Sequence, residues 1–215
     1  MPMETLALNE QNWLEIADGH GTLHYGANQE WYGALWRRKA GCGPTAASVM
    51  LAYLAHTRPG LQKLCPLPKL EKESFVAYMD EVWEYVTPGP QGLNTLRKYS
   101  AGVKDFAEAQ GVELHPVELA VPRKMTDRPG FDKCVSFLRT ALEGGCPVAF
   151  LNLHKGALEN LDSWHWVLIT GLSLDGEAAI VTVADGGDKV EIDLRLWYDT
   201  TKEGGGFVCV PENPS

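Results

Sequence analysis

Residues 40–51 read AGCGPTAASVML, a pattern that predicts a helix beginning at Cys42. Pro44 suits the first turn of a helix, where a backbone N–H has no partner inside the helix. Arg58-Pro59-Gly60 should end this helix. Between these limits, apolar residues recur at the spacing of one helical face, at Ala46, Val49, Met50, Tyr53 and Leu54.

Outward from this helix, the chain changes from helical to extended patterns midway. Two more helices are predicted over about 71–86 and 94–110, the second with Asn94 as its cap and Gly111 at its end. Asp185-Gly186-Gly187-Asp188 predicts a hairpin turn. The pattern also predicts an extended segment at about 112–121, a helix at 131–143, and strands at 147–153, 165–171, 177–184, 189–194 and 206–211.

Helices followed by strands predict an α+β fold, with N-terminal helices packed on one side of a C-terminal antiparallel sheet. The sequence contains no internal repeat and no Ser/Gly-rich linker. We therefore expect one domain over residues 1–215, with a helical part at about 40–111 and a β-rich part at about 112–211.

The composition narrows the class of protein. With 215 residues, 45% hydrophobic and 22% charged, the chain resembles globular domains rather than disordered or fibrous ones. Twenty-eight acidic against 19 basic residues, with no basic stripe, argue against a nucleic-acid partner. No apolar run predicts a membrane span, and the sequence leaves the oligomeric state open. Without a basic, apolar leader or a CxxC pair, we expect a cytoplasmic protein with reduced thiols.

Cys42 is the first candidate for chemistry. At a helix N-terminus, the unpaired N–H groups and the positive end of the helix dipole favour a thiolate, which is the nucleophilic form of cysteine. Gly41 and Gly43 would let a substrate backbone approach closely. The alternative is a small buried cysteine in a tight turn.

His165 is the second candidate, in the stretch SWHWVLITG at residues 163–171. It opens a predicted strand on which His165, Val167 and Ile169 share one face and Trp164 and Trp166 the other. An imidazole there could take the proton of a thiol and later protonate a leaving group. The alternative is a packed core histidine.

Asp185 is the third candidate, at the end of the next strand in VTVADGG. In a hairpin meander this end lies beside the start of the His165 strand, within reach of the second imidazole nitrogen. A carboxylate there would orient the base, although Asp-Gly also forms turns that have no catalytic role.

Together, Cys42, His165 and Asp185, with the strings GCGPTAASVML, HWVLITG and VTVAD, resemble the papain-like cysteine peptidases. The resemblance covers about residues 26–210 and is greatest to the branch of the bacteriocin-leader (double-glycine) peptidases. It implies a papain-like fold, with Cys42 as nucleophile, His165 as general base and acid, and Asp185 as the orienting residue.

The sequence departs from that family at the oxyanion hole. Family members carry a glutamine about six residues before the cysteine, whereas here that residue is Trp36. Among the upstream amides, Gln29 could serve if residues 30–41 bulge out as an insertion, because an amide N–H₂ suits a developing negative charge. Gln29 could instead be an ordinary loop residue. The nearby aromatic residues, which could line a substrate cleft or close the core, are Trp31, Tyr32 and Trp36.

Other patterns in the sequence give weaker evidence for a functional site. Gly41-x-Gly43-x-x-Ala46 matches a dinucleotide-binding pattern, but no buried strand precedes it. His20 and His24 have the spacing of helical zinc ligands, but Gly19 and Gly21 oppose a helix, so we expect a solvated or packed pair. There is no GxSxG motif. Packing explains the other cysteines, Cys65, Cys134, Cys146 and Cys209.

The sequence therefore predicts a cysteine-dependent hydrolase that needs no cofactor and no metal and acts on a peptide or protein substrate. One alternative keeps the triad but transfers the acyl group to an amine or thiol, or deamidates. Another is a non-catalytic module that binds peptides in an aromatic cleft, with a metal site at Cys42, His165 and Asp185 as its variant.

Overall fold

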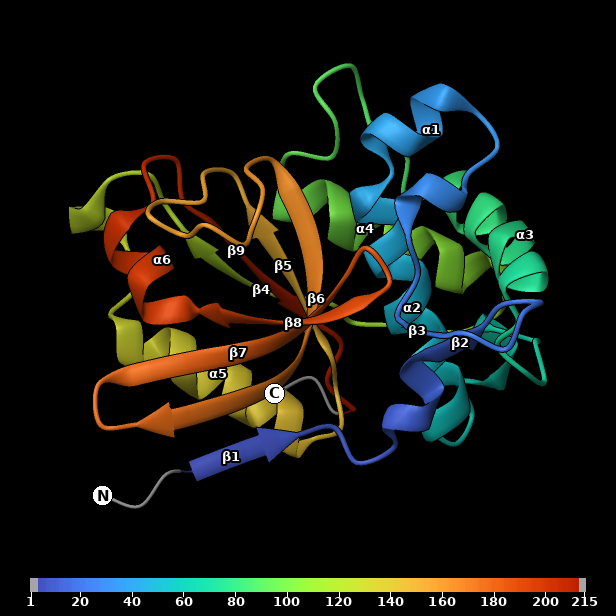
Figure 1. Cartoon of the computed structure of the whole chain (residues 1–215), viewed down its shortest axis with the longest axis horizontal. Coiled ribbons are helices and arrows are strands. Elements are labelled where there is room, and N and C mark those ends of the chain that lie inside the picture. Colours follow the sequence, from blue (N-terminus) through green and yellow to red (C-terminus); the bar gives the residue numbers. More distant parts are fainter. Residues whose placement is uncertain (1–3, 213–215) are drawn as a thin grey trace.

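The chain is α+β, as predicted, and is built on one large antiparallel sheet (Figure 1). The computed structural model describes residues 4–212, and within that range seven strands join in the order β4-β9-β5-β6-β7-β8, with β1 paired to β6 outside this order. The expected unit 1–215 thus has its ends, 1–3 and 213–215, outside the described residues. The strands are β1 (Glu4–Ala7), β4 (Val117–Val121), β5 (Val148–Asn152), β6 (His165–Asp175), β7 (Ala178–Asp185), β8 (Asp188–Asp193) and β9 (Gly205–Cys209).

Six α-helices lie within the described range, four of them close to their predicted positions. They are α1 (Leu35–Ala40), α2 (Cys42–Thr57), α3 (Lys72–Trp83), α4 (Leu96–Ala109), α5 (Phe131–Glu143) and α6 (Leu194–Thr200). The sequence did not predict α1, α6, β1 or the small sheet of β2 (Glu15–Ala17) and β3 (Leu23–Tyr25). Strand β6 is four residues longer than expected, and β4 covers only the second half of the segment 112–121.

Helices cover both faces of the sheet, so the expectation of helices on one side is wrong. Trp166 of β6 stacks on Tyr99 of α4 with ring centroids 4.3 Å apart. Leu151 of β5 lies opposite Trp166, and because side chains alternate along a strand, Phe150 points to the other face. There Phe150 packs edge-on against Trp197 of α6 at 4.6 Å. In Figure 1, α2, α3 and α4 gather to the right of the strands, α6 lies at their left, and α5 passes behind β7.

The helical and β-rich parts share one continuous cluster of buried apolar side chains. Helix α2 supplies much of it, because every residue from Gly43 to Ala55 is buried. Arg58 ends α2 in an extended conformation, as the Arg58-Pro59-Gly60 signal predicts. The most buried helix of the chain thus carries Cys42 at its first residue.

Two helix ends differ from their predicted positions. Thr95, not Asn94, caps α4: its backbone is extended, and its hydroxyl oxygen accepts a hydrogen bond from the Lys98 N–H at 3.3 Å. The Asn94 side chain instead accepts from the Lys98 ammonium at 3.2 Å. Helix α3 ends at Trp83, and a turn follows over 84–86. The end of α4 is as predicted, with a φ of 70° at Gly111.

The β7–β8 hairpin brings the end of β7 beside the start of β6. Gly186 and Gly187 have φ values of 59° and 88°, so both central turn residues need the left-handed backbone that glycine adopts readily. The predicted turn is therefore confirmed. Because β6 and β7 are antiparallel, Asp185 at the end of β7 lies next to His165 at the start of β6.

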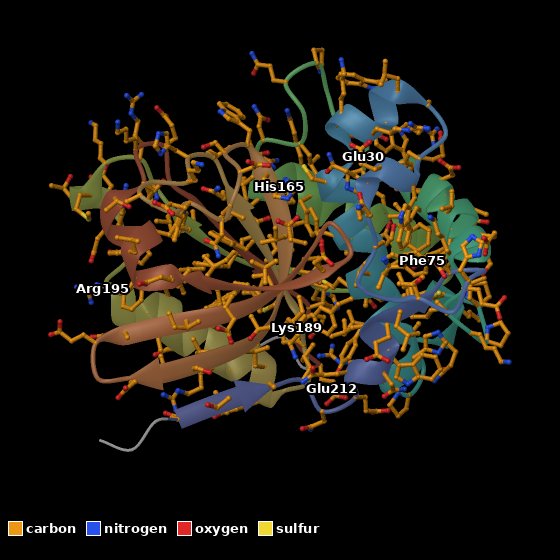
Figure 2. All side chains as sticks on the ribbon, viewed as in Figure 1. Glu30, Phe75, His165, Lys189, Arg195 and Glu212 are labelled. Atoms are coloured by element: carbon orange, nitrogen blue, oxygen red, sulfur yellow. The ribbon has the colours of Figure 1, made fainter. Side chains whose placement is uncertain are left out.

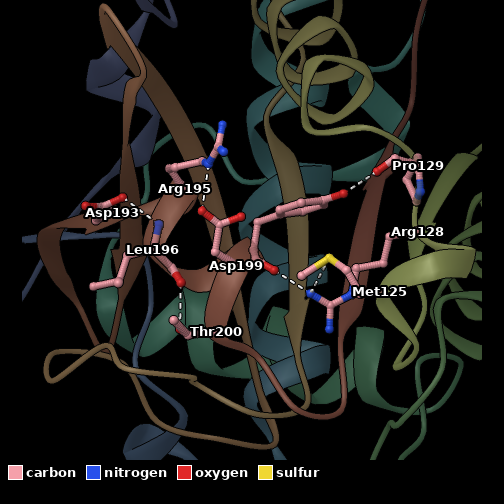
Figure 3. A network of polar contacts seen from close by, with 9 residues as sticks. Met125, Arg128, Pro129, Asp193, Arg195, Leu196, Asp199 and Thr200 are labelled. Carbon is pink, nitrogen blue, oxygen red and sulfur yellow. Dashed lines mark hydrogen bonds and ion pairs between the residues drawn. The ribbon is translucent and has the colours of Figure 1, made fainter.

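Helix α6 is held at both ends by side-chain hydrogen bonds (Figure 3) and supports the loop that leads into β6. Asp193 caps the helix by accepting from the Leu196 N–H at 2.8 Å, and the Arg128 guanidinium donates to the Tyr198 carbonyl at the other end. Thr200 of α6 accepts a hydrogen bond from the Ala157 N–H at 2.9 Å. The irregular segment 153–164 is thereby attached to a helix that is itself fixed at both ends.

Candidate functional site

Cys42 is the first residue of α2, as predicted, and its side chain is half-buried. The glycines on either side have a packing role that differs from the predicted one. A Cβ on Gly41 would collide with the Arg37 carbonyl and the Tyr32 ring, and one on Gly43 would lie 2.6 Å from a Leu93 methyl. Close packing of the protein therefore accounts for both glycines, rather than space left for a substrate.

His165 and Asp185 form a short side-chain contact at the site. The imidazole Nε2 and a carboxylate oxygen of Asp185 are 2.7 Å apart, and both side chains are largely buried. Cys42 lines the same cavity as His165 and is close enough to raise the pKa of the imidazole. Since Asp185 occupies Nε2, Nδ1 is the nitrogen left for the thiol. The structure thus places all three predicted residues in the lining of one cavity.

The protonation of His165 follows from these contacts. Burial alone lowers the pKa of its imidazole, but the hydrogen bond and charge of Asp185, together with the neighbouring Cys42, raise it from 6.5 to about 10. The imidazole is therefore protonated across the neutral pH range.

Gln29 lies beside this triad, in a single turn of 3₁₀ helix, Gln29–Trp31. Helix α1 occupies half of residues 30–41 and stands away from the sheet in Figure 1, whereas Tyr32 and Gly41 of the same segment are buried. The Gln29 amide donates one hydrogen bond to the Arg38 carbonyl at 2.8 Å, and its buried oxygen has no hydrogen-bond partner. An amide N–H₂ has two protons, so one remains for a ligand.

Asn28 ties the Gln29 segment to the Asp185 turn, a role that the sequence did not reveal. Its side-chain nitrogen donates to the Gly186 carbonyl at 2.6 Å, and its side-chain oxygen accepts from the Glu30 N–H at 2.8 Å. An Asn at the start of a helical turn is a detectable signal, but its long-range partner is not. Asn28 thus links the segment of Gln29 to the turn that follows Asp185.

Asn152 performs a similar task behind His165. It is fully buried opposite His165 in β5, accepts from the Trp197 indole N–H at 2.8 Å, and donates to the Asp162 carbonyl at 2.5 Å. A buried amide with both ends satisfied rigidifies its surroundings. The one polar residue of an apolar strand was the available sequence signal for it.

One cavity of about 200 Å³ joins the four predicted residues, Cys42, His165, Asp185 and Gln29. Two exposed acidic side chains, Glu30 and Asp162, also line it. Figure 2 shows Glu30 and His165 toward the same edge of the molecule. The cavity therefore combines a thiol, an imidazole, an amide donor and negative charge.

Of the three aromatic residues before Cys42, two pack in or against the core and one lines a cavity. Tyr32 is fully buried, and Trp31 packs against the core, so these two close the core. Trp36 is half exposed and lines a second cavity with Cys42. Trp164 also lines that cavity, and it precedes β6 rather than sharing a strand face with Trp166, which corrects the predicted pairing.

Among the remaining candidates, His20 and His24 are not on a helix: His20 is exposed, and His24 packs edge-on against Trp31 at 5.1 Å. Outside Cys42, the cysteines are buried free thiols. Within residues 4–212, no group of three or more His, Cys, Asp or Glu side chains could hold a metal ion. Nor does any helix in that range have the length and apolar character to cross a membrane.

No protein-family model matches the chain, and no curated protein matches it either.

Proposed function

We propose that this chain is a cysteine-dependent hydrolase of papain-like fold that cleaves a peptide or amide bond. The observation that carries the proposal is the hydrogen bond of 2.7 Å between His165 and Asp185, in a cavity that Cys42 also lines. Nucleophilic catalysis by a thiol requires a base next to the nucleophile and a third group that orients the base.

In the proposed reaction, the Cys42 sulfur attacks the substrate carbonyl after its proton has passed to His165. The tetrahedral oxyanion accepts hydrogen bonds from the Cys42 backbone N–H and the free amide proton of Gln29. His165 then gives its proton to the leaving amine, and the C–N bond breaks to leave a thioester. Water attacks the thioester, its proton returns to His165, and a carboxylic acid is released from Cys42.

The proposal includes a cytoplasmic setting. A catalytic thiol must remain reduced, and all five cysteines are free thiols, four of them buried. Reduced, unpaired cysteines are typical of a cytosolic chain.

The first test is cleavage of a peptide library, read by mass spectrometry, with the intact protein and with Cys42→Ala. We expect cleavage by the intact protein and none by Cys42→Ala at unchanged thermal stability. Cys134→Ala removes a buried thiol of α5 and is the matched control, which should retain cleavage. Cleavage by Cys42→Ala would refute the proposed nucleophile.

The second test is the rate of Cys42 alkylation by iodoacetamide at pH 6, in the intact protein and in His165→Ala. A thiolate–imidazolium pair predicts rapid alkylation that falls sharply in His165→Ala. If Cys42 instead reacts only above about pH 8, as free thiols do, the triad is inactive and a peptide-binding module becomes the better account.

A further inference from the structure

A second cavity, of about 460 Å³, opens on another side of Cys42. Its lining is mostly apolar and includes Leu93, Leu151 and Leu153. Leu93 is held in place, because its carbonyl accepts the Trp166 indole N–H at 2.6 Å and its side chain packs against Gly43. The cavity therefore has a fixed apolar surface that begins at the proposed nucleophile.

Two exposed tryptophans complete the lining. Trp36 lies on α1 and is 51% exposed, and Trp164 is 59% exposed. Indole rings carry large apolar surface, and leaving two of them in water beside one cavity is unfavourable unless something covers them. Their shared position points to a ligand with an apolar group.

Trp36 is presented by a helix that is fixed in orientation. The Arg37 guanidinium of α1 donates to Asp80 at 2.7 Å and to Glu84 at 2.8 Å, both in or next to α3. It also lies 5.0 Å from the centroid of the Trp83 ring. The inserted segment therefore holds Trp36 beside the cavity.

Trp164 is presented by a strained backbone. Among residues 4–212 it is the one non-glycine residue with a positive φ, at 58°. This conformation is unfavourable for a bulky side chain and persists where the surroundings enforce it, often at functional sites. Here the adjoining loop is anchored through the Asp162 carbonyl to Asn152 and through the Ser163 hydroxyl to the Lys155 N–H.

The two cavities at Cys42 also differ in charge. Glu30, Asp162 and Asp185 line the first cavity, whereas the one charged side chain that lines the second is Lys39. An acidic group would be repelled in the first cavity, and an apolar group gains most in the second. A substrate that spans Cys42 thus meets two different environments.

We propose that the cavity between Trp36 and Trp164 is a subsite for a bulky apolar side chain, aromatic or branched aliphatic, on a residue that flanks the scissile bond. This inference rests on the proposed hydrolase function for the identity of the scissile bond. It names the substrate class: peptides in which a large apolar residue lies next to the cleaved bond.

The experiment measures alkylation of Cys42 by two series of small electrophiles, acetyl-X-chloromethyl ketones and chloroacetyl-X-amides, with X as Phe, Leu, Gly or Asp. The two series place the side chain on opposite sides of the reacting carbon. In each reaction an S–C bond forms and chloride leaves, so no turnover is needed. Rates are divided by those with glutathione to remove intrinsic reactivity.

We expect Phe and Leu reagents of one series to alkylate Cys42 about tenfold faster than the Gly reagent, a discrimination that apolar pockets reach. Trp36→Ala and Trp164→Gly should each remove most of this preference, measured relative to the variant's own iodoacetamide rate. Trp164→Asn tests the ring separately, because Asn, like Gly, tolerates a positive φ. Leu35→Ala is the matched control: Leu35 is a neighbouring exposed residue of α1 outside the cavity lining and should leave the preference intact.

Equal normalised rates for Phe, Gly and Asp in both series would overturn the subsite and leave the hydrolase proposal standing. A preference that survives Trp36→Ala and Trp164→Gly would also overturn it. The reverse result, a strong apolar preference without any peptide cleavage, would support the subsite and refute the hydrolase. Absence of Cys42 alkylation by every reagent would contradict both.

Discussion

Replacing Asp185 with asparagine tests the electrostatic basis of the site directly. The substitution keeps the shape of the side chain and removes the charge that lies 2.7 Å from His165 Nε2. A hydrogen bond to a charged group is worth about 1.5–3 kcal/mol, and one pKa unit corresponds to about 1.4 kcal/mol. The pKa of His165, about 10 in the intact protein, should therefore fall by about one to two.

The assay is an NMR titration of the His165 imidazole between pH 5 and 11. Asp188→Asn is the matched control, because it removes an equal charge from the exposed other end of the same turn. It should leave the His165 midpoint in place. An unchanged midpoint in Asp185→Asn, or an equal fall in both variants, would refute the argument that the contact itself holds the proton.

The same pair links stability to pH. The pKa of His165 is raised in the folded protein, so its contribution to stability is fully present below the unfolded value of 6.5 and is lost as pH rises through about 10. Urea unfolding at pH 6 and pH 10.5 should show a larger loss of stability for the intact protein than for Asp185→Asn. An identical loss in both would contradict the assignment.

Three further outcomes are expected. Gln29→Leu should lower kcat for a cleaved peptide by about 10²–10³ with little change in KM, the effect of losing one oxyanion donor; an unchanged kcat would remove Gln29 from the site. Asn152→Ala leaves a buried indole N–H unpaired and should lower the free energy of unfolding in urea by about 1–3 kcal/mol. Gly41→Ala forces a Cβ against the backbone and should lower the free energy of unfolding by about 1–3 kcal/mol. Gly33→Ala places its Cβ where no atom lies within 4 Å and should leave the free energy of unfolding almost unchanged. Equal stabilities of the two variants would contradict the close packing around Gly41.

Local patterns predicted the elements whose signals are local. The helical spacing after Cys42, the Asp-Gly-Gly-Asp turn and the apolar strands all depend on residues a few positions apart. The contact between His165 and Asp185 also follows from the sequence, because consecutive strands of a meander place the end of one beside the start of the other.

The sequence did not predict elements that are short or that depend on contacts with distant segments of the chain. Strand β1 has four residues, and its pairing to β6 joins segments more than 160 residues apart. Helix α6 has seven residues and depends on contacts with distant segments such as Arg128. Strand β5 is buried on both faces, and its continuous apolar run was a signal against helices on one side that the prediction did not use.

For the candidate site, the sequence by itself predicted the three candidate residues Cys42, His165 and Asp185, because each lies at the end of an element with a strong local pattern. Only the tertiary structure decided that Gln29 and Cys42 line the same cavity and that the two exposed tryptophans line another. It also decided that Asn28 and Asn152 make the hydrogen bonds that join distant segments around the site. These features depend on side chains from distant segments meeting in space. Spacing along the chain has no information about such meetings, since loop closure and packing set them.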